Sequence, residues 1–160
     1  MVSTRLISEV ERMLSIFEKL QLKNHGEILL LNAPASFEPE VATLVGVRVL
    51  RALKGVEDVK FALTFVTKQD QLSALGAAVA RKAKGDAVIW FAYPKGTSKK
   101  YKSEINRDNG WQVLGEGGFE PVRMVAIDED WSALRFRRVE HIKTMTRAKE
   151  SRMTAQGKAR

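Results

Sequence analysis

Three apolar runs of strand length, separated by segments of helical spacing, constrain the fold of this chain more than any other feature. The runs are 27–34 (EILLLNAP), 59–67 (VKFALTFVT) and 86–94 (DAVIWFAYP). A near-continuous apolar run of this length is typical of a strand that is buried on both faces of a parallel sheet. Between the second and third runs, residues 69–83 place Leu72, Leu75 and Val79 at helical spacing. This alternation predicts an α/β fold with a parallel sheet.

The other segments extend this pattern. The sequence predicts an amphipathic helix over 6–20, a short helix and then a strand within 38–53, a helix from Asn106 through 114, and strands over 119–128 and 131–139. The last two strands are close enough in sequence to pair antiparallel. We therefore expect a single three-layer α/β sandwich, Rossmann-like, with a mostly parallel sheet and an antiparallel edge strand.

Length and composition predict one domain. The 160 residues are 44% hydrophobic and 29% charged, which suits one ordinary globular domain over 1–149. The absence of cysteine excludes disulfides, thiolate metal sites and cysteine nucleophiles. The N-terminus carries acids among its apolar residues, unlike a secretory signal, and no apolar stretch is long enough to span a membrane. The sequence thus favours a cytoplasmic protein without a membrane partner.

The positive charge is concentrated at the C-terminus. The net charge of the chain is +8, but residues 137–160 hold eight Lys or Arg and two Glu, which leaves only +2 for residues 1–136. Residues 150–160 are predicted to form a basic, flexible tail. Contact between this tail and nucleic acid is one reading, since phosphates attract clustered cations.

Four predicted strands end in polar or proline-bearing turns, at 32–34, 67–69, 93–100 and 128–130. If these strands are parallel, the turns share one edge of the sheet, where ligands of open α/β sheets bind. The candidate ligand-binding residues at this edge are Asn32, Thr67, Tyr93, Lys95, Thr97, Ser98, Lys99 and Asp128.

The segment 95–100 (KGTSKK) carries the functional hypothesis. Its ammonium groups and hydroxyls could hold a phosphate or carboxylate, and Gly96 would let the backbone approach it. The alternative is a solvated loop whose lysines keep a strand end in water. The spacing is not that of a P-loop, and no Gly-x-Gly-x-x-Gly follows the first strand, so a dinucleotide is disfavoured and no cofactor is predicted.

The other candidate chemistry has a structural alternative in each case. Asp128 and Asp130 could meet a divalent cation, but a turn held by the acids is the favoured interpretation, so no metal site is predicted. No serine lies in a Gly-x-Ser-x-Gly elbow. Trp90, Trp111 and Trp131 could stack on bases, but apolar neighbours favour a place in the core.

Several segments resemble a family of small bacterial proteins of unknown function. They are LLLNAP, IWFAYPKGTSKKYK, INRDNGW, VAIDEDWSALRFR and IKTMTR, and the resemblance covers roughly residues 20–147. It implies a small α/β domain in the bacterial cytoplasm, and it implies no reaction, cofactor or catalytic residue.

Two functions follow as expectations. The first is an uncharacterised protein that binds an anionic small molecule, bearing phosphate or carboxylate, in the crevice at the strand ends. The alternative is an interaction protein whose basic tail contacts nucleic acid or an acidic partner. The residues leave open whether the chain is an enzyme and what its oligomeric state is.

Overall fold

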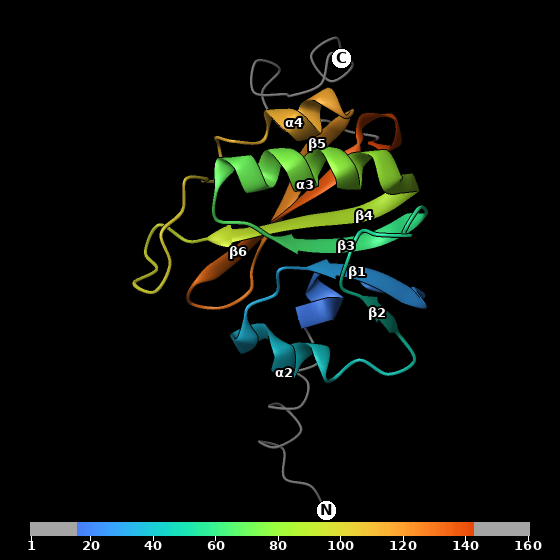
Figure 1. The fold of residues 1–160 in the computed structure, drawn as a ribbon, viewed down its shortest axis with the longest axis horizontal. Helices are drawn as coiled ribbons and strands as arrows, with labels where there is room; N and C mark the ends of the chain where they lie inside the picture. Colours follow the sequence, from blue (N-terminus) through green and yellow to red (C-terminus); the bar gives the residue numbers. More distant parts are fainter. Residues whose placement is uncertain (1–15, 143–160) are drawn as a thin grey trace, which may run out of the picture.

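The computed structural model describes residues 16–142, which form a six-stranded sheet between two helical layers (Figure 1). The strands are β1 (Glu27–Leu31), β2 (Arg48–Leu50), β3 (Val59–Phe65), β4 (Ala83–Pro94), β5 (Phe119–Ala126) and β6 (Trp131–Arg138). The helices are α2 (Glu38–Val41), α3 (Gln69–Lys82) and α4 (Gln112–Glu116), with 3-10 turns η1 (Ala35–Phe37) and η2 (Val139–His141). The predicted α/β sandwich with its mostly parallel sheet is confirmed.

The strand order is β2-β1-β3-β4-β6-β5. β1 pairs parallel with both β2 and β3, and β3 pairs parallel with β4. β6 is antiparallel to both β4 and β5, so the predicted antiparallel hairpin is present and completes this side of the sheet. The chain leaves β1 toward β2 and then returns to β3 on the other side of β1. The strand order therefore reverses between β1 and β3.

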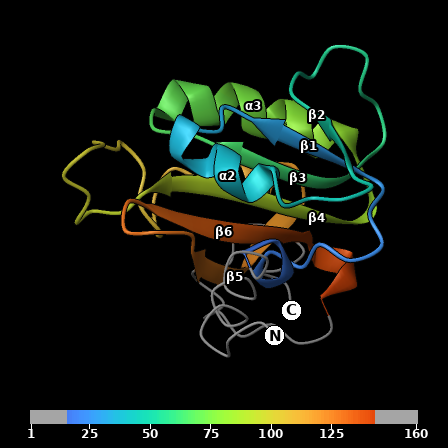
Figure 2. The ribbon, with the colours of Figure 1, turned by 90° about the horizontal axis from the view of Figure 1, so that it is seen from below.

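Both faces of the sheet are apolar, as the continuous runs predict. Figure 1 shows α3 and α4 on one face and α2 on the other. In Figure 2, where the molecule is seen from below, α2 lies in front of the strands. Alternate residues of β4 serve the two layers: Phe91 belongs to the core under α3, and Trp90 to the core on the α2 face. The Trp90 indole N–H donates to the carbonyl of Leu20 at 2.7 Å, which attaches the N-terminal segment to the sheet.

The predicted helix from Asn106 differs from the structure. Asn106 does not begin a helix: its side-chain oxygen accepts the backbone N–H groups of Asp108 and Asn109, closing a turn. Gly110 then takes φ +104°, so helix α4 begins only at Gln112.

Strand β4 begins earlier than its apolar run. Val59 of β3 pairs with Ala83, but Phe61 already pairs with Val88, so β4 contains extra residues at this point. A bulge of this kind bends a strand and can re-aim its side chains. It brings Asp86 beside Arg137 of β6, whose guanidinium donates to both carboxylate oxygens at 2.8 and 2.6 Å.

Some predictions lie outside the described residues. They are the first part of the N-terminal helix, over 6–15, and the basic tail over 150–160; the extent of the domain, 1–149, also stays a prediction. Among residues 16–142, no helix is long and apolar enough to cross a membrane.

The ion pair of Asp86 with Arg137 generates a pH-dependent prediction. The pKa of Asp86 is lowered, and the largest cause is hydrogen bonding from Arg137 to its carboxylate. A carboxyl whose pKa is lower in the folded state stabilises the fold above its unfolded pKa, and loses this contribution as the pH falls through the folded value. Since both side chains are about one-third exposed, we expect Asp86→Asn to lower the free energy of unfolding by at most about 1 kcal/mol at neutral pH.

Urea unfolding of wild type and Asp86→Asn across acid and neutral pH measures this contribution. The difference between the two proteins should vanish in acid, and Glu129→Gln, in an exposed turn, serves as the control. A difference that persists unchanged at low pH would contradict the assignment.

Candidate functional site

The turns that follow β1, β3 and β4 lie at one edge of the sheet, here called the carboxyl edge. The turn between β5 and β6 lies there as well, because β5 runs in the same direction as β4. The backbone N–H of Lys95 donates to the carbonyl of Asp130 at 2.8 Å, which joins the loop after β4 to this turn.

The lysine-rich loop is held in place by Ser98. Its hydroxyl donates to a carboxylate oxygen of Asp130 at 2.8 Å. The same hydroxyl oxygen accepts the backbone N–H groups of Lys100 and Tyr101, at 3.3 and 3.1 Å. Ser98 therefore uses both its donor and its acceptor capacity to shape the loop.

Asp128 has a structural role. One of its carboxylate oxygens accepts the backbone N–H groups of Asp130 and Trp131, both at 2.8 Å. This is the turn that an aspartate after a strand typically forms. Within residues 16–142, no group of three His, Asp or Glu side chains could hold a metal ion. The Asp128 carboxylate thus holds the hairpin turn.

Asn32 and Thr67 connect elements at the strand ends. The side-chain amide of Asn32, which takes φ +60°, donates to the carbonyl of Phe65 at 3.3 Å. The backbone N–H of Thr67 donates to the side-chain oxygen of Gln71, and its carbonyl accepts the N–H of Glu104 at 3.0 Å. Both residues bridge neighbouring parts of the carboxyl edge.

A cavity of about 810 Å³ lies between the loop 95–107, the end of β4 and the β5–β6 hairpin. We call it the edge pocket. Its lining residues are Tyr93, Pro94, Lys95, Gly96, Thr97, Ser98, Tyr101, Lys102, Ser103, Glu104, Ile105, Asn106, Arg107, Met124 and Ser132.

The structure brings together half of the predicted site residues. Tyr93, Lys95, Thr97 and Ser98 line the edge pocket. The residues that do not line it are Asn32, Thr67, Lys99 and Asp128. The predicted crevice across all four turns is therefore divided, and only its part beside β4 forms this cavity.

Tyr93 supplies the most buried polar group of the edge pocket. The residue is only 5% exposed, and its ring contacts the ring of Trp111. Its hydroxyl lies 3.5 Å from the sulfur of Met124, a weak acceptor. Burial raises the pKa of the Tyr93 phenol, so the hydroxyl stays protonated at neutral pH and can donate a hydrogen bond.

Sequence reasoning missed the wall of the pocket that comes from the hairpin and from residues after the lysines. Met124 is half-exposed on β5, and Ser132 is nearly buried on β6. Glu104 fixes the wall opposite, because its carboxylate accepts the N–H of Gln69 at the start of α3. In the sequence, Met124 is visible only as one apolar residue of the predicted strand over 119–128, and its exposure is a property of the structure.

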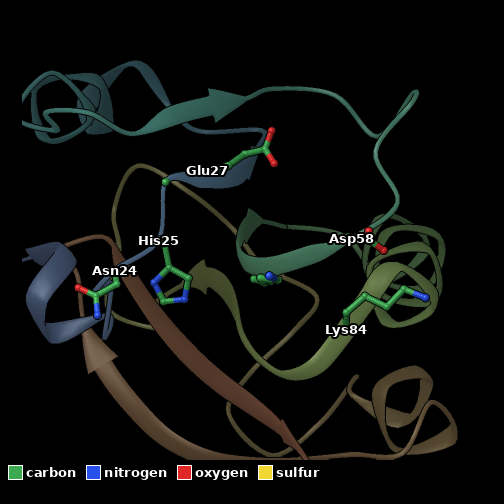
Figure 3. A pocket seen from close by; sticks show the side chains of 7 residues that line it. Asn24, His25, Glu27, Asp58 and Lys84 are labelled. Carbon is green, nitrogen blue, oxygen red and sulfur yellow. The ribbon is translucent and has the colours of Figure 1, made fainter.

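A second cavity, of about 640 Å³, lies at the opposite edge of the sheet, where β1, β3 and β4 begin (Figure 3). In this view Glu27 points up from β1, and Lys84 extends away from His25. His25 accepts the N–H of Lys23 at its Nδ1, while burial and then Lys60 lower its pKa. The imidazole is neutral, and these groups do not converge on one point.

No family model matches this chain, and no curated protein matches it. The predicted resemblance to a bacterial family of unknown function stays a prediction.

The fold matches solved structures at low sequence identity. A SAM-dependent methyltransferase from Aquifex aeolicus has a TM-score of 0.56 and 15% identity, with 87% of this chain and 100% of that chain covered. The N-methyltransferase NodS from Bradyrhizobium japonicum, in complex with S-adenosyl-L-homocysteine, has a TM-score of 0.51 and 10% identity, with 86% and 89% covered. A possible exported protein from Bordetella parapertussis has a TM-score of 0.53 and 8% identity, with 84% and 69% covered.

These likenesses show a Rossmann-like fold, which solved methyltransferases also have. The function predicted from the sequence, an uncharacterised protein that binds an anionic small molecule at the strand ends, is wrong on these findings, because the solved structures with this fold include several methyltransferases. The bonding of Ser98 and Asp128 gives the physical reason, since both are engaged in holding turns. The alternative, nucleic acid contact by the tail, gains no support.

The anchoring of the loop by Ser98 generates a prediction. Ser98→Ala removes one hydrogen bond to Asp130 and the acceptor for two backbone N–H groups, so we expect it to lower the free energy of unfolding by about 1–2 kcal/mol. Hydrogen exchange should show faster exchange of the Tyr101 amide. Thr97→Val, an exposed neighbour for which the structure shows no side-chain hydrogen bond, is the matched control. Equal exchange rates in both variants would contradict the anchoring role.

Proposed function

We propose that this chain binds a small organic molecule in the edge pocket, on a fold of the methyltransferase type. The observation that supports this most directly is the cavity of about 810 Å³ beside β4. Its size falls within the range of small-molecule sites, which is roughly 300–1,000 Å³. It also lies at the carboxyl end of β4, where the loop 95–107 supplies most of its lining.

The lining of the pocket favours a flat molecule with hydrogen-bonding substituents. Tyr101, Ile105 and Met124 offer apolar surface, and methionine adapts to ligands of differing shape. Among residues 16–142, the hydrogen-bond partner of the Tyr93 hydroxyl is the sulfur of Met124, a weak acceptor. A carbonyl or hydroxyl oxygen of the ligand would be a stronger acceptor than that sulfur. Tyr93 is therefore the residue that we expect to orient the ligand.

Methyl transfer is the second candidate function, because structures described as SAM-dependent methyltransferases share the fold. The methyl donor would lie where the strand order reverses, at the ends of β1 and β3. The residues there do not fit it: no glycine occurs between Glu27 and Val45, and the buried ring of Phe37 packs against the end of β3. Fold likeness alone does not establish a reaction, so we rank small-molecule binding first.

Two neighbouring positions on β5 give a matched test of the edge pocket. Met124 lines the pocket and is 50% exposed, while Val122 is 39% exposed and does not line it. We expect Met124→Trp to fill the pocket and to weaken ligand binding by about tenfold or more. Val122→Trp should leave binding unchanged.

A library of small organic molecules, screened by ligand-detected NMR on the wild type, would supply the ligand. Amide chemical shifts should then move in residues 93–107 and 124–132. Tyr93→Phe keeps the ring but removes the hydroxyl, so it should lower the affinity for the same ligand. If the two tryptophan variants bind equally, or if the shifts occur elsewhere, the edge pocket is not the site.

A further inference from the structure

We infer that the loop after β1, residues Asn32–Phe37, closes the position at which this fold would place an adenosyl group, so that the chain does not use S-adenosylmethionine there. We call this segment the exit loop. In a sheet with the order β2-β1-β3, the reversal between β1 and β3 is where a nucleotide-type ligand has access to loop backbone. In this chain, residues of the exit loop occupy that position and contact the end of β3.

The first residue of the exit loop bridges the reversal. Asn32 adopts a left-handed backbone conformation that directs its amide toward the neighbouring strand, where it donates to the carbonyl of Phe65. Phe65 is the last residue of β3. A hydrogen bond thus crosses between the two strand ends, where a ligand would otherwise separate them.

The last residue of the exit loop enters the core. Phe37 is only 2% exposed, and its ring lies 5.1 Å from the ring of Phe65 and 5.7 Å from that of Phe17. Phe65 in turn contacts Trp131 at 5.0 Å, and Trp131 contacts Tyr101 at 4.9 Å. A continuous row of aromatic rings therefore runs from the N-terminal segment to the loop after β4. This row occupies the α2 face of the carboxyl edge.

The backbone groups just after β3 also have partners within the protein. The N–H of Val66 donates to the carbonyl of Ala92 at 2.9 Å. Thr67 donates to Gln71 and accepts from Glu104, and the N–H of Gln69 donates to the Glu104 carboxylate. Ligand carboxylates are commonly held by free N–H groups at the start of a helix. Here Gln71 and Glu104 take two of the N–H groups at the start of α3.

The end of β2 also departs from the pattern of nucleotide sites. An acidic side chain about 20 residues after the first strand is what nucleotide folds use to hold the ribose. The residue directly after β2 is Arg51, whose guanidinium donates to both carboxylate oxygens of Glu38, at 2.7 and 2.9 Å. That hydrogen bonding lowers the pKa of Glu38. A base therefore stands where such a site has its acid, and the nearby Glu38 carboxylate is engaged by this arginine.

Titration with S-adenosyl-L-homocysteine tests the inference directly. On the full-length wild type we expect no saturable heat and no amide shifts in residues 32–38 and 65–69, at ligand up to about 1 mM, the weak end of specific binding. Saturable binding with shifts in those residues would overturn the inference. Shifts confined to the edge pocket would support it, because the adenosyl group would then avoid the reversal between β1 and β3.

A second measurement examines whether the exit loop is part of the core. Phe37→Ala should raise the equilibrium constant for unfolding by about a hundredfold or more, as removal of a buried ring does. Val45→Ala, at a residue that is 92% exposed, should change the constant by no more than about twofold. If Phe37→Ala has as little effect as the control, the loop is free to receive a ligand and the inference fails.

This inference stands apart from the proposed function. The edge pocket is tested by Met124→Trp and Val122→Trp on β5, whereas closure of the reversal is tested by Phe37 and by the adenosyl compound. If the edge pocket proves not to bind a ligand, the test of closure at the reversal can still be interpreted, and the converse also holds.

Discussion

The end of strand β3 at Phe65 is the point on which the arrangement of the carboxyl edge depends. Its carbonyl accepts the Asn32 amide, and its ring contacts both Phe37 and Trp131. One residue therefore joins β1, the exit loop and the hairpin. Because interiors are close-packed, a ring in this position leaves no room for a ligand on the same face. What space remains lies farther along the sheet, beside β4.

The edge pocket follows from the way the loop after β4 is attached. Ser98 fixes one end of the loop to the hairpin through Asp130, and Glu104 fixes the other to Thr67 and to the start of α3. Held at both ends, the loop lines one side of a cavity whose other lining residues include Tyr93 and Met124. The polar residues of the loop thus form the walls of a site.

Fold and site give different information about this chain. The strand order and the likeness to solved methyltransferases describe one architecture. The residues at the strand reversal differ from what a nucleotide-type ligand needs, since Phe37 is buried there and Arg51 is paired with Glu38. A fold can host unrelated functions because function resides in a few side chains at loop positions, which change without disturbing the core. The edge pocket is where such side chains gather in this protein.

The sequence by itself determined the α/β class, the strands of the sheet and the antiparallel hairpin, because hydrophobic periodicity and short connections are local properties. It also placed Trp90, Trp111 and Trp131 correctly in the core. It misjudged Asn106, since a left-handed Gly110 stops the helix that composition favoured. Only the tertiary structure decided which strand-end residues meet. Asn32 donates a hydrogen bond to Phe65 at the reversal. Tyr93 and Met124 are 31 residues apart in sequence, and they come together across β6. Strand order sets those distances, and it depends on non-local pairing that no local pattern encodes.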